Sequence, residues 1–491
     1  MTEQMTDRNR WIALYVLCVG VLMIVLDATV VNVALPSIQT DLHFTQSSLA
    51  WVVNAYLIAF GGLLLLAGRL GDLAGRKLIM MIGLVVFTTA SLVCGLAQSQ
   101  EVLVAARFVQ GIGGALTSAV ILGMIVTMFP EPREQAKAIG VYGFVASAGG
   151  SVGLLAGGII TQAIDWHWIF FVNVPIGIAT GFLAVRLLPR DTGIGFASGA
   201  DIPGAVLITS ALMLGVYTIV KPAADYGWGA GRTLAFGAAS LALLLAFLAR
   251  EATARHPLMP LRIFRSRNVS GANAVQALLV AGMFGMFFLG ALYLQRVLGY
   301  DALKIGFAFL PATIVMGTLS LRFSERLIMN FGPKTTLLPG LVLITIGLLL
   351  FARVPVHGSY FADVFPVMIL LGLGVGGSFP ALMTLAMSGA TREDAGLASG
   401  LVNTAAQVGG ALGLAVLATL SATRTTHLLA GGSSHTAALT GGYHLAFLVG
   451  AGFTTLAVIV AAVALRVEVR PTEQAVAEAQ VEAERELVEI A

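Results

Sequence analysis

The chain has 491 residues, of which 57% are hydrophobic and only 11% are charged, with a net charge of +3. A soluble domain carries about a quarter of charged residues, so this composition excludes an ordinary soluble enzyme, a disordered chain and a nucleic-acid-binding protein. The two cysteines, Cys18 and Cys94, lie inside apolar runs. They predict neither a disulfide framework nor a metal site.

Fourteen apolar segments follow one another, separated by charges, prolines and turn residues. A membrane helix needs about 20 mostly apolar residues. A backbone in lipid must satisfy its own polar groups, so we predict that each segment is a transmembrane helix. The predicted spans are 11–36, 49–67, 78–97, 102–128, 138–161, 168–188, 202–220, 232–249, 271–295, 305–321, 335–352, 364–387, 396–421 and 443–465.

The distribution of basic residues predicts the orientation. With the N-terminus in the cytoplasm, 21 of the 28 Lys and Arg residues fall in inner segments or at inner span ends, 6 fall in outer segments or at outer span ends, and one, Arg107, lies deeper within a span. This bias follows the positive-inside rule and predicts an even number of spans with both termini cytoplasmic. Twelve spans with a shallow hairpin at 202–249 would give the same bias, so the charges leave both numbers open.

Two cytoplasmic loops share a short motif. Gly75 and Lys77 in the first correspond to Gly332 and Lys334 in the second, at an offset of 257 that also carries the first six spans roughly onto the last six. Transporters are often built from such repeats, with the substrate site between them near the middle of the bilayer. We therefore predict an N-terminal six-helix bundle at 1–190, two extra helices and a cytoplasmic linker at 191–264, a C-terminal six-helix bundle at 265–466 and an acidic cytoplasmic tail at 467–491.

Asp27 is the only acidic residue inside a predicted span, and Arg107 is the only basic one that lies away from the ends of its span. An ionisable side chain at such a depth is costly and by default indicates function. The span limits and a rise of 1.5 Å per residue place the two side chains at depths about 6 Å apart, so they are expected to pair or to meet through water. Reversible protonation of Asp27 is the functional interpretation. A permanently paired carboxylate that only joins two helices is the alternative.

The loop after the second span combines glycines with charges. Gly68 and Gly75 allow a tight turn, and Asp72 is expected to cap or face a helix N-terminus. Arg76 and Lys77 are expected at the cytoplasmic surface, where they anchor the topology.

Glycines recur at every fourth position of the fifth span, at Gly149, Gly153 and Gly157, and Gly158 follows them. Such a face lets helix backbones approach closely, so ordinary tight packing is one interpretation and a functional helix is the other. Polar and aromatic candidates for a cavity that suits an amphiphile are Asn54, Gln110, Asn273, Gln276, Phe284, Phe288, Tyr293, Asn403 and Gln407.

Five stretches stand in a characteristic order: LDATVVNVALP at 26–36, GRLGDLAGRK at 68–77, RFVQGIGGAL at 107–116, WIFFVNVPIG at 168–177 and GLASGLVNTAAQVGGALGLAVL at 396–417. Together they resemble the major facilitator superfamily, and most of all its fourteen-span drug:proton antiporter family, over about residues 11–466. Three positions depart from the family pattern. Leu154 follows Gly153 where relatives carry proline, Leu73 replaces a basic residue, and Ala406 stands where many relatives carry arginine.

The resemblance implies an all-helical fold of two six-helix bundles around a central cavity, with two additional central helices, that alternates between inward-open and outward-open states. It implies that Asp27 takes part in proton coupling with help from Arg107. It also implies that Asp72, Arg76 and Lys77 lock the outward-open state from the cytoplasmic side.

One acid and one base in the cavity nearly cancel, so a dicationic substrate would lack partners there. We therefore expect proton-coupled export of a lipophilic, neutral or weakly charged drug, antibiotic or natural product. The expected partners are that substrate, protons and membrane lipid. The expected protein is a monomer of the bacterial plasma membrane, not an enzyme, without metal, cofactor or nucleic acid. A lipid or lysolipid translocator of the same fold is the alternative, and a non-transporting membrane sensor is an alternative of another class.

Overall fold

The computed structural model describes residues 7–129, 131–189, 201–255, 257–259, 261–388 and 395–466, together with Asp191, Gly193 and Gly195. The predicted tail at 467–491 lies outside these residues. Throughout the described ranges the chain is helical, and no strand occurs in them.

The first half is a helical bundle. Its helices are α1 (Asp7–Asp41), α2 (Gln46–Ala74), α3 (Arg76–Gly95), α4 (Gln100–Met128), α5 (Pro132–Ala163), the single-turn α6 (Trp168–Phe171) and α7 (Asn173–Leu187). Helices α2 and α3 pack against α4, and α1 packs against α5.

The extra segment and the second half follow. The extra segment contains α8 (Ile202–Val220), α9 (Pro222–Tyr226) and α10 (Gly231–Thr253). The second half contains η2 (Leu261–Arg265), α11 (Arg267–Arg296), α12 (Ala302–Thr318), η3 (Leu319–Phe323), α13 (Ser324–Phe331), α14 (Pro333–Phe351), η4 (Tyr360–Val364), α15 (Phe365–Ser388), α16 (Ala395–Ala430) and α17 (His435–Ala464). Here α11 packs against α16 and α17, and α14 packs against α15.

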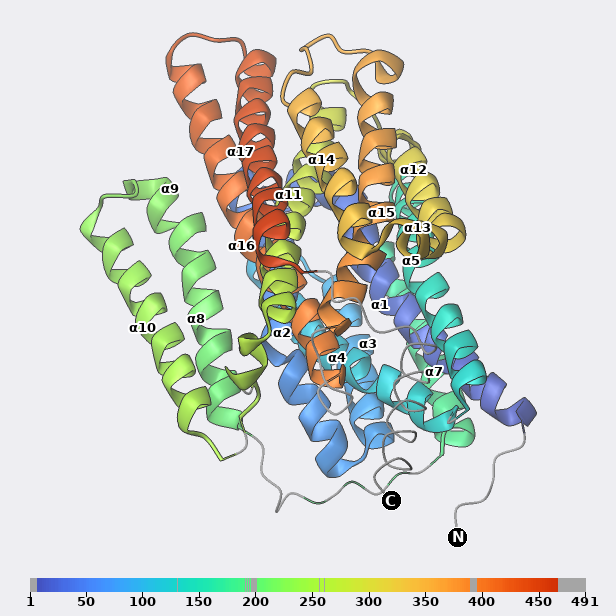
Figure 1. Cartoon of the computed structure of the whole chain (residues 1–491). Helices are drawn as coiled ribbons and strands as arrows, with labels where there is room; N and C mark the ends of the chain where they lie inside the picture. Colours follow the sequence, from blue (N-terminus) through green and yellow to red (C-terminus); the bar gives the residue numbers. More distant parts are fainter. Residues whose placement is uncertain are drawn as a thin grey trace, which may run out of the picture.

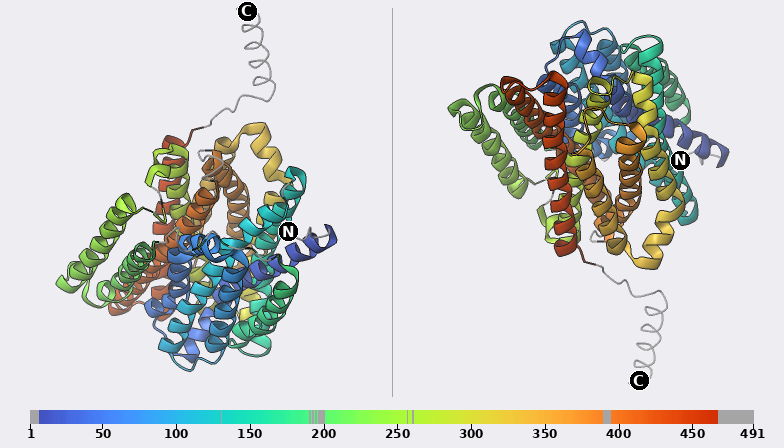
Figure 2. Two further views of the ribbon diagram at one scale, coloured as in Figure 1. Left: turned by 90° about the horizontal axis from the view of Figure 1, so that it is seen from below. Right: turned by 90° about the horizontal axis from the view of Figure 1, so that it is seen from above.

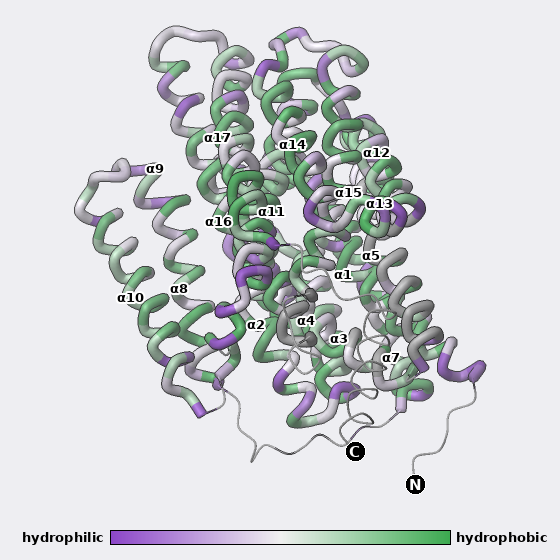
Figure 3. The backbone as a smooth tube through the Cα atoms, viewed as in Figure 1, coloured by the Kyte–Doolittle hydropathy of each residue, from purple (hydrophilic) through white to green (hydrophobic). Residues whose placement is uncertain are grey.

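Each predicted span coincides with a helix, the sixth being divided between α6 and α7. Twelve of the described helices are long and apolar enough to cross a membrane, and both α8 and α10 are among them. Helix α5 has 32 residues, and the shorter α12 continues directly into the π-helical η3. The helices therefore support fourteen spans over a shallow hairpin at 202–249. Figure 3 shows the hydrophobic residues along the helices, with hydrophilic residues concentrated near their ends.

Short polar side chains fix where many of these helices begin. The oxygen of such a residue accepts a hydrogen bond from one of the unpaired N–H groups in the first helical turn. Caps of this kind are made by Thr45 for α2, Ser99 for α4, Asp201 for α8, Ser266 for α11, Asp301 for α12 and Ser434 for α17.

The prediction that the second span ends at residue 67 and that a loop follows was wrong. Helix α2 continues to Ala74, and the turn is confined to Gly75, whose φ of 102° is accessible mainly to glycine. Arg69 and Asp72 lowered the local hydropathy, but charged side chains are tolerated in a helix that emerges at the membrane surface. Gly68 and Asp72 therefore lie on the last turns of α2.

The residues shared by the two loop motifs adopt the same roles in both halves: a glycine forms the turn between two helices, and a lysine donates to carbonyls at the end of another helix. Gly332 also has a positive φ, 86°, between α13 and α14. Lys77 Nζ donates to two carbonyls at the end of α7, at 2.9 and 2.6 Å. Lys334 Nζ donates to two carbonyls at the end of α17, both at 2.7 Å. Each lysine thus satisfies unpaired carbonyls at the negative end of the last helix of its half.

The two halves meet where α2 packs against α16 and where α5 packs against α12, and α8 packs against both α2 and α16. The α8–α10 pair therefore lies beside the junction of the halves, although it is central in the sequence (Figures 1 and 2). Thr209 approaches Gly62 of α2 closely, and Thr419 Oγ1 of α16 donates to the Ile219 carbonyl at 3.3 Å. Small residues at these contacts let the backbones come near.

Candidate functional site

A fully buried ion pair lies in the first half. Asp27 on α1 is 2% exposed, and Arg107 on α4 is 1% exposed. Arg107 Nη1 lies 2.5 Å from Asp27 Oδ2, so the two side chains pair directly and not through water. A buried charge of this kind requires both a partner and hydrogen bonds to its remaining atoms.

The second carboxylate oxygen of Asp27 is held by two side-chain amides. Gln110 Nε2 of α4 donates to Oδ1 at 2.8 Å, and Asn173 Nδ2 of α7 donates to it at 3.0 Å. Both amides also donate to Ser91 Oγ of α3, at 3.1 and 3.0 Å, and Ser91 Oγ donates to the Phe170 carbonyl at 2.9 Å. One carboxylate is therefore connected to α3, α4 and α7 as well as to its own helix.

Sequence reasoning missed Ser91 and Asn173 as members of this site. Asn173 lies in the stretch at 168–177 that resembled the family, but nothing local distinguished its role. Its position as the first residue of α7 brings its amide to the depth of Asp27. Small polar residues are ordinary in membrane helices, so only the helix arrangement reveals their partners.

Arg107 keeps several contacts besides Asp27. Its Nε donates to the Val52 carbonyl at 3.0 Å, and its Nη1 donates to Gln110 Oε1 at 2.7 Å. The guanidinium carbon lies 4.4 Å from the centre of the Tyr56 ring and 5.7 Å from that of Phe170. Aromatic faces stabilise a cation at such distances, so the guanidinium retains partners if Asp27 becomes neutral.

Several other buried polar atoms have no hydrogen-bond partner among the described residues. They include both side-chain amide atoms of Asn54 and of Gln276, and Gln407 Oε1. Burying such groups without a partner costs about 1–3 kcal/mol each. Gln407 lies on α16 directly opposite Gly61 of α2, at the junction of the halves.

The remaining cavity candidates are spread over different environments. Asn273 donates to the Val269 carbonyl of its own helix at 2.8 Å. Phe284 packs on Gly410, and Asn403 is exposed. Phe288 and Tyr293 are fully buried in the hydrophobic core, where the Tyr293 hydroxyl donates to a backbone carbonyl at 2.9 Å. Asn54, Gln276 and Gln407 thus have unpaired polar side-chain atoms. Asn273, Phe284 and Tyr293 instead contact other parts of the protein.

The charged residues on either side of the α2–α3 turn make their contacts inside the first half. Arg76 pairs with Asp72 at 3.1 Å, and its Nη1 donates to the Gly123 carbonyl at 2.9 Å and to Thr127 Oγ1 at 2.8 Å, both on α4. Asp72, which was expected to cap or face a helix N-terminus, does not cap α3 but pairs with its first residue. Asp191 takes that place, because its carboxylate accepts from the first two N–H groups of α3 at 2.6 and 3.1 Å.

The glycine face of α5 packs against α1. A Cβ on Gly149 would lie 3.0 Å from Leu22 of α1, one on Gly157 would lie 3.0 Å from the Val30 carbonyl, and one on Gly153 would overlap Thr29 Oγ1. Gly158 instead faces the start of α12, where a Cβ would lie 2.8 Å from the Ala302 carbonyl. The stripe therefore allows α1, which carries Asp27, to lie close to α5.

Gly153→Ala is expected to destabilise the protein by about 1–3 kcal/mol, because the added methyl group overlaps Thr29. Gly150→Ala is the matched control, since a Cβ there has only a 3.9 Å contact with Thr29. The control should be neutral or stabilising by up to about 1 kcal/mol. Thermal unfolding in detergent measures both, and adding Thr29→Ala should restore much of the loss at Gly153. Equal effects of the two alanines would contradict this packing.

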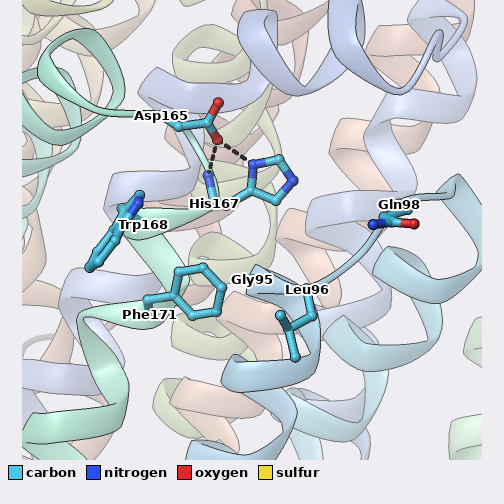
Figure 4. A pocket seen from close by; sticks show the side chains of 7 residues that line it. All are labelled: Gly95, Leu96, Gln98, Asp165, His167, Trp168 and Phe171. Atoms are coloured by element: carbon cyan, nitrogen blue, oxygen red, sulfur yellow. Dashed lines mark hydrogen bonds and ion pairs between the residues drawn. The ribbon is translucent and has the colours of Figure 1, made fainter.

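A separate pocket of about 340 Å³ lies at the α3–α4 connection (Figure 4). Its lining residues are Gly95, Leu96, Gln98, Asp165, His167, Trp168 and Phe171. Partial burial acts to raise the pKa of the Asp165 carboxyl, but the backbone N–H and the ring of His167 outweigh it and hold that pKa below its ordinary value. No side chain of the Asp27 network lines this pocket.

Two related halves of long apolar helices, an additional pair of such helices beside their junction, and a buried ion pair in the first half define a multi-pass membrane transport protein. The chain matches the Major Facilitator Superfamily over residues 17–414. It belongs to that family, and the resemblance predicted from its motifs is confirmed. The family and the relatives of this chain are transporters and not enzymes.

The relatives include antibiotic resistance and export proteins. A puromycin resistance protein of Streptomyces alboniger is 39% identical over 84% of this chain and 82% of its own length. A cephamycin export protein of Amycolatopsis lactamdurans is 38% identical over 83% of this chain and 84% of its own length. A lincomycin resistance protein of Streptomyces lincolnensis is 35% identical over 85% of this chain and 86% of its own length.

Solved structures share the fold at low sequence identity. A bacterial homolog of the human lysosomal transporter Spinster, inward-facing and unoccupied, has a TM-score of 0.68 with 16% identity, covering 94% of this chain and 98% of that chain. The two six-helix bundles expected from the sequence are therefore confirmed.

Proposed function

We propose that this protein exports lipophilic, neutral or weakly charged drugs, antibiotics or natural products in exchange for protons. The observation that carries the proposal is the Asp27–Arg107 pair. It is a fully buried ion pair between two helices that are long and apolar enough to span a membrane, in a chain whose relatives are antibiotic resistance and export proteins. We place the protein as a monomer in the plasma membrane of a bacterium, with both termini cytoplasmic.

Proton binding to Asp27 removes the negative charge that holds Arg107. The guanidinium then relies on the Val52 carbonyl, Gln110 Oε1 and the Tyr56 ring, which already contact it. Because the same carboxylate accepts from Gln110 and Asn173, its neutralisation weakens the ties between α1, α4 and α7 at once. This change in packing is how we propose that protonation shifts the equilibrium between inward-open and outward-open states.

The charged residues at the α2–α3 turn, Asp72, Arg76 and Lys77, are proposed to lock the outward-open state from the cytoplasmic side. In the present structure Arg76 and Lys77 fasten α3 to α4 and α7. Asp72 is half-exposed, so it is free to exchange its contact with Arg76 for one with the second half.

The substrate class follows from charge and from the unpaired amides. Asp27 and Arg107 neutralise one another, so a dication would gain no ionic partner from them. Asn54, Gln276 and Gln407 instead offer neutral donors and acceptors, which suit hydroxyl, ketone and amide groups on an otherwise apolar molecule.

Gln276→Leu is expected to raise the KM for a transported neutral drug by about 2–10-fold, the value of one hydrogen bond. The same change should stabilise the unliganded protein, because it removes an unpaired buried amide. Asn273→Leu is the matched control on the same helix, because its amide already donates to a carbonyl of that helix.

Drug uptake into inside-out vesicles measures KM, and thermal unfolding measures stability. An unchanged KM in Gln276→Leu, for every neutral drug that the wild type carries, would contradict the proposed contact. Transport of a labelled lysolipid with no transport of drugs would replace the drug proposal with lipid translocation.

A further inference from the structure

A second buried charged cluster lies away from Asp27, where the extra helix pair meets the linker between the halves. Asp201 precedes α8, and Arg250 and Glu251 lie in the last turn of α10. Asp201 and Glu251 are each only 3% exposed. Arg250 Nε lies 3.0 Å from Asp201 Oδ1 and 3.3 Å from its Oδ2, so Asp201 is fully paired.

Glu251 is only half satisfied. Its Oε2 accepts from the backbone N–H of Met259 in the linker at 2.8 Å. Its Oε1 is buried and has no hydrogen-bond partner among the described residues. A buried carboxylate oxygen without a donor is costly while it carries charge.

Glu251 Oε1 lies near the other acid. Asp201 Oδ2 and Glu251 Oε1 lie 2.6 Å and 2.9 Å from the position that a Cβ on Gly204 would occupy, so the two oxygens are about 5.5 Å apart or less. Asp201 and Arg250 are the charged side chains that act on Glu251 within the described structure, and the other groups facing it are the backbone N–H groups of Leu258 and Met259. Two carboxylates therefore share one cation.

We propose that Glu251 is a second proton-binding site, which faces the cytoplasm and is separate from the Asp27 site. A proton from cytoplasmic water binds Oε1, so the cluster changes from a net charge of −1 to neutral. The protonated oxygen becomes a donor directed at Asp201. Arg250, whose side chain is 45% exposed, gives the cluster its access to water.

The bound proton fastens the linker because it removes the repulsion between Glu251 and Asp201, which outweighs the weaker hydrogen bond that a neutral carboxyl accepts from Met259. Glu251 is tied to Met259, and Met259 packs on a small hydrophobic cluster formed by Ile263, Val269 and Leu401 together with Leu65. Leu65 lies near the end of α2 and Leu401 near the start of α16, the two helices that join the halves. Loss of the proton leaves an uncompensated charge at this junction and loosens the linker, so cytoplasmic pH acts on the connection between the halves.

Infrared spectroscopy tests this without any transport measurement. A protonated carboxyl has a carbonyl stretching band that a carboxylate lacks. The experiment compares Asp27→Asn with the double variant Asp27→Asn/Glu251→Gln in detergent, so that Asp27 contributes to neither spectrum. We expect a band in the first at neutral pH that is absent from the second and that fades as pH rises. Identical spectra would overturn the proposal, whether or not the protein exports drugs.

Two further variants keep the test decisive. Asp201→Asn removes the like charge, so the Glu251 band should fade at a lower pH than in the parent, and an unmoved titration would contradict the shared cluster.

Glu251→Gln mimics the protonated acid, since its amide still accepts from Met259 and donates toward Asp201. Trypsin cleavage at the exposed Arg255 should accelerate several-fold with rising pH in the wild type and stay slow in Glu251→Gln. Equal pH dependence in both would show that Glu251 does not control the linker.

Discussion

Replacing Arg107 by glutamine is expected to destabilise the protein by about 3–5 kcal/mol, the cost of leaving one partner of a buried ion pair alone. Asp27 would keep its hydrogen bonds from Gln110 and Asn173, but these neutral donors cannot balance a full charge at that depth. Thermal or denaturant unfolding in detergent measures the loss.

The double variant Asp27→Asn/Arg107→Gln provides the control. The asparagine introduced at position 27 can accept from Gln110 and Asn173 and donate to the new glutamine, so donors and acceptors match again without any charge. We expect it to be more stable than Arg107→Gln alone, because the coupling between contacting residues is not additive. A double variant less stable than the single one would contradict the account of this pair.

Replacing Asp27 by asparagine is expected to abolish proton-driven drug accumulation in inside-out vesicles, down to the level of vesicles without the protein. The site would no longer bind and release a proton, although exchange of drug down its own gradient should continue. Asp41→Asn is the matched control on the same helix. Asp41 accepts a hydrogen bond from Trp166 Nε1 at 3.0 Å, and asparagine can still accept it.

The expression level and unfolding temperature of Asp27→Asn must be measured beside its transport, because Arg107 loses its counter-charge. Retained proton-driven accumulation in a folded Asp27→Asn protein would assign coupling to another group. Loss of downhill exchange as well would assign Asp27 a structural role only.

The helices could be predicted from the sequence because lipid leaves the backbone few choices. Every span had to satisfy its own N–H and C=O groups, so apolar length alone located it. Helix ends were less certain, since hydropathy reports the membrane surface and not the last hydrogen bond. The continuation of α2 through Asp72 to Ala74 is the clearest example.

Asp27 and Arg107 could be predicted because a charge inside an apolar run has few explanations. Ser91 and Asn173 could not, since their significance depends on α3 and α7 placing them at one carboxylate. The cap that Asp191 provides for α3 joins residues 115 positions apart, and no local pattern reports such a contact.

The aromatic candidates on α11 could not be sorted by sequence. The helix is apolar on all faces, so its rotation about its own axis is not encoded by periodicity. The structure turns Phe288 and Tyr293 into the core, whereas Gln276 has an unpaired buried amide.

The most direct test of proton-coupled export is proton release from acidified inside-out vesicles when a drug is added. We expect that several lipophilic neutral compounds discharge the gradient in wild-type vesicles, that a dicationic dye does so much more slowly, and that none does so with Asp27→Asn. If no neutral compound discharges the gradient in the wild type, or if the dication is exported at the same rate, the central claim is contradicted.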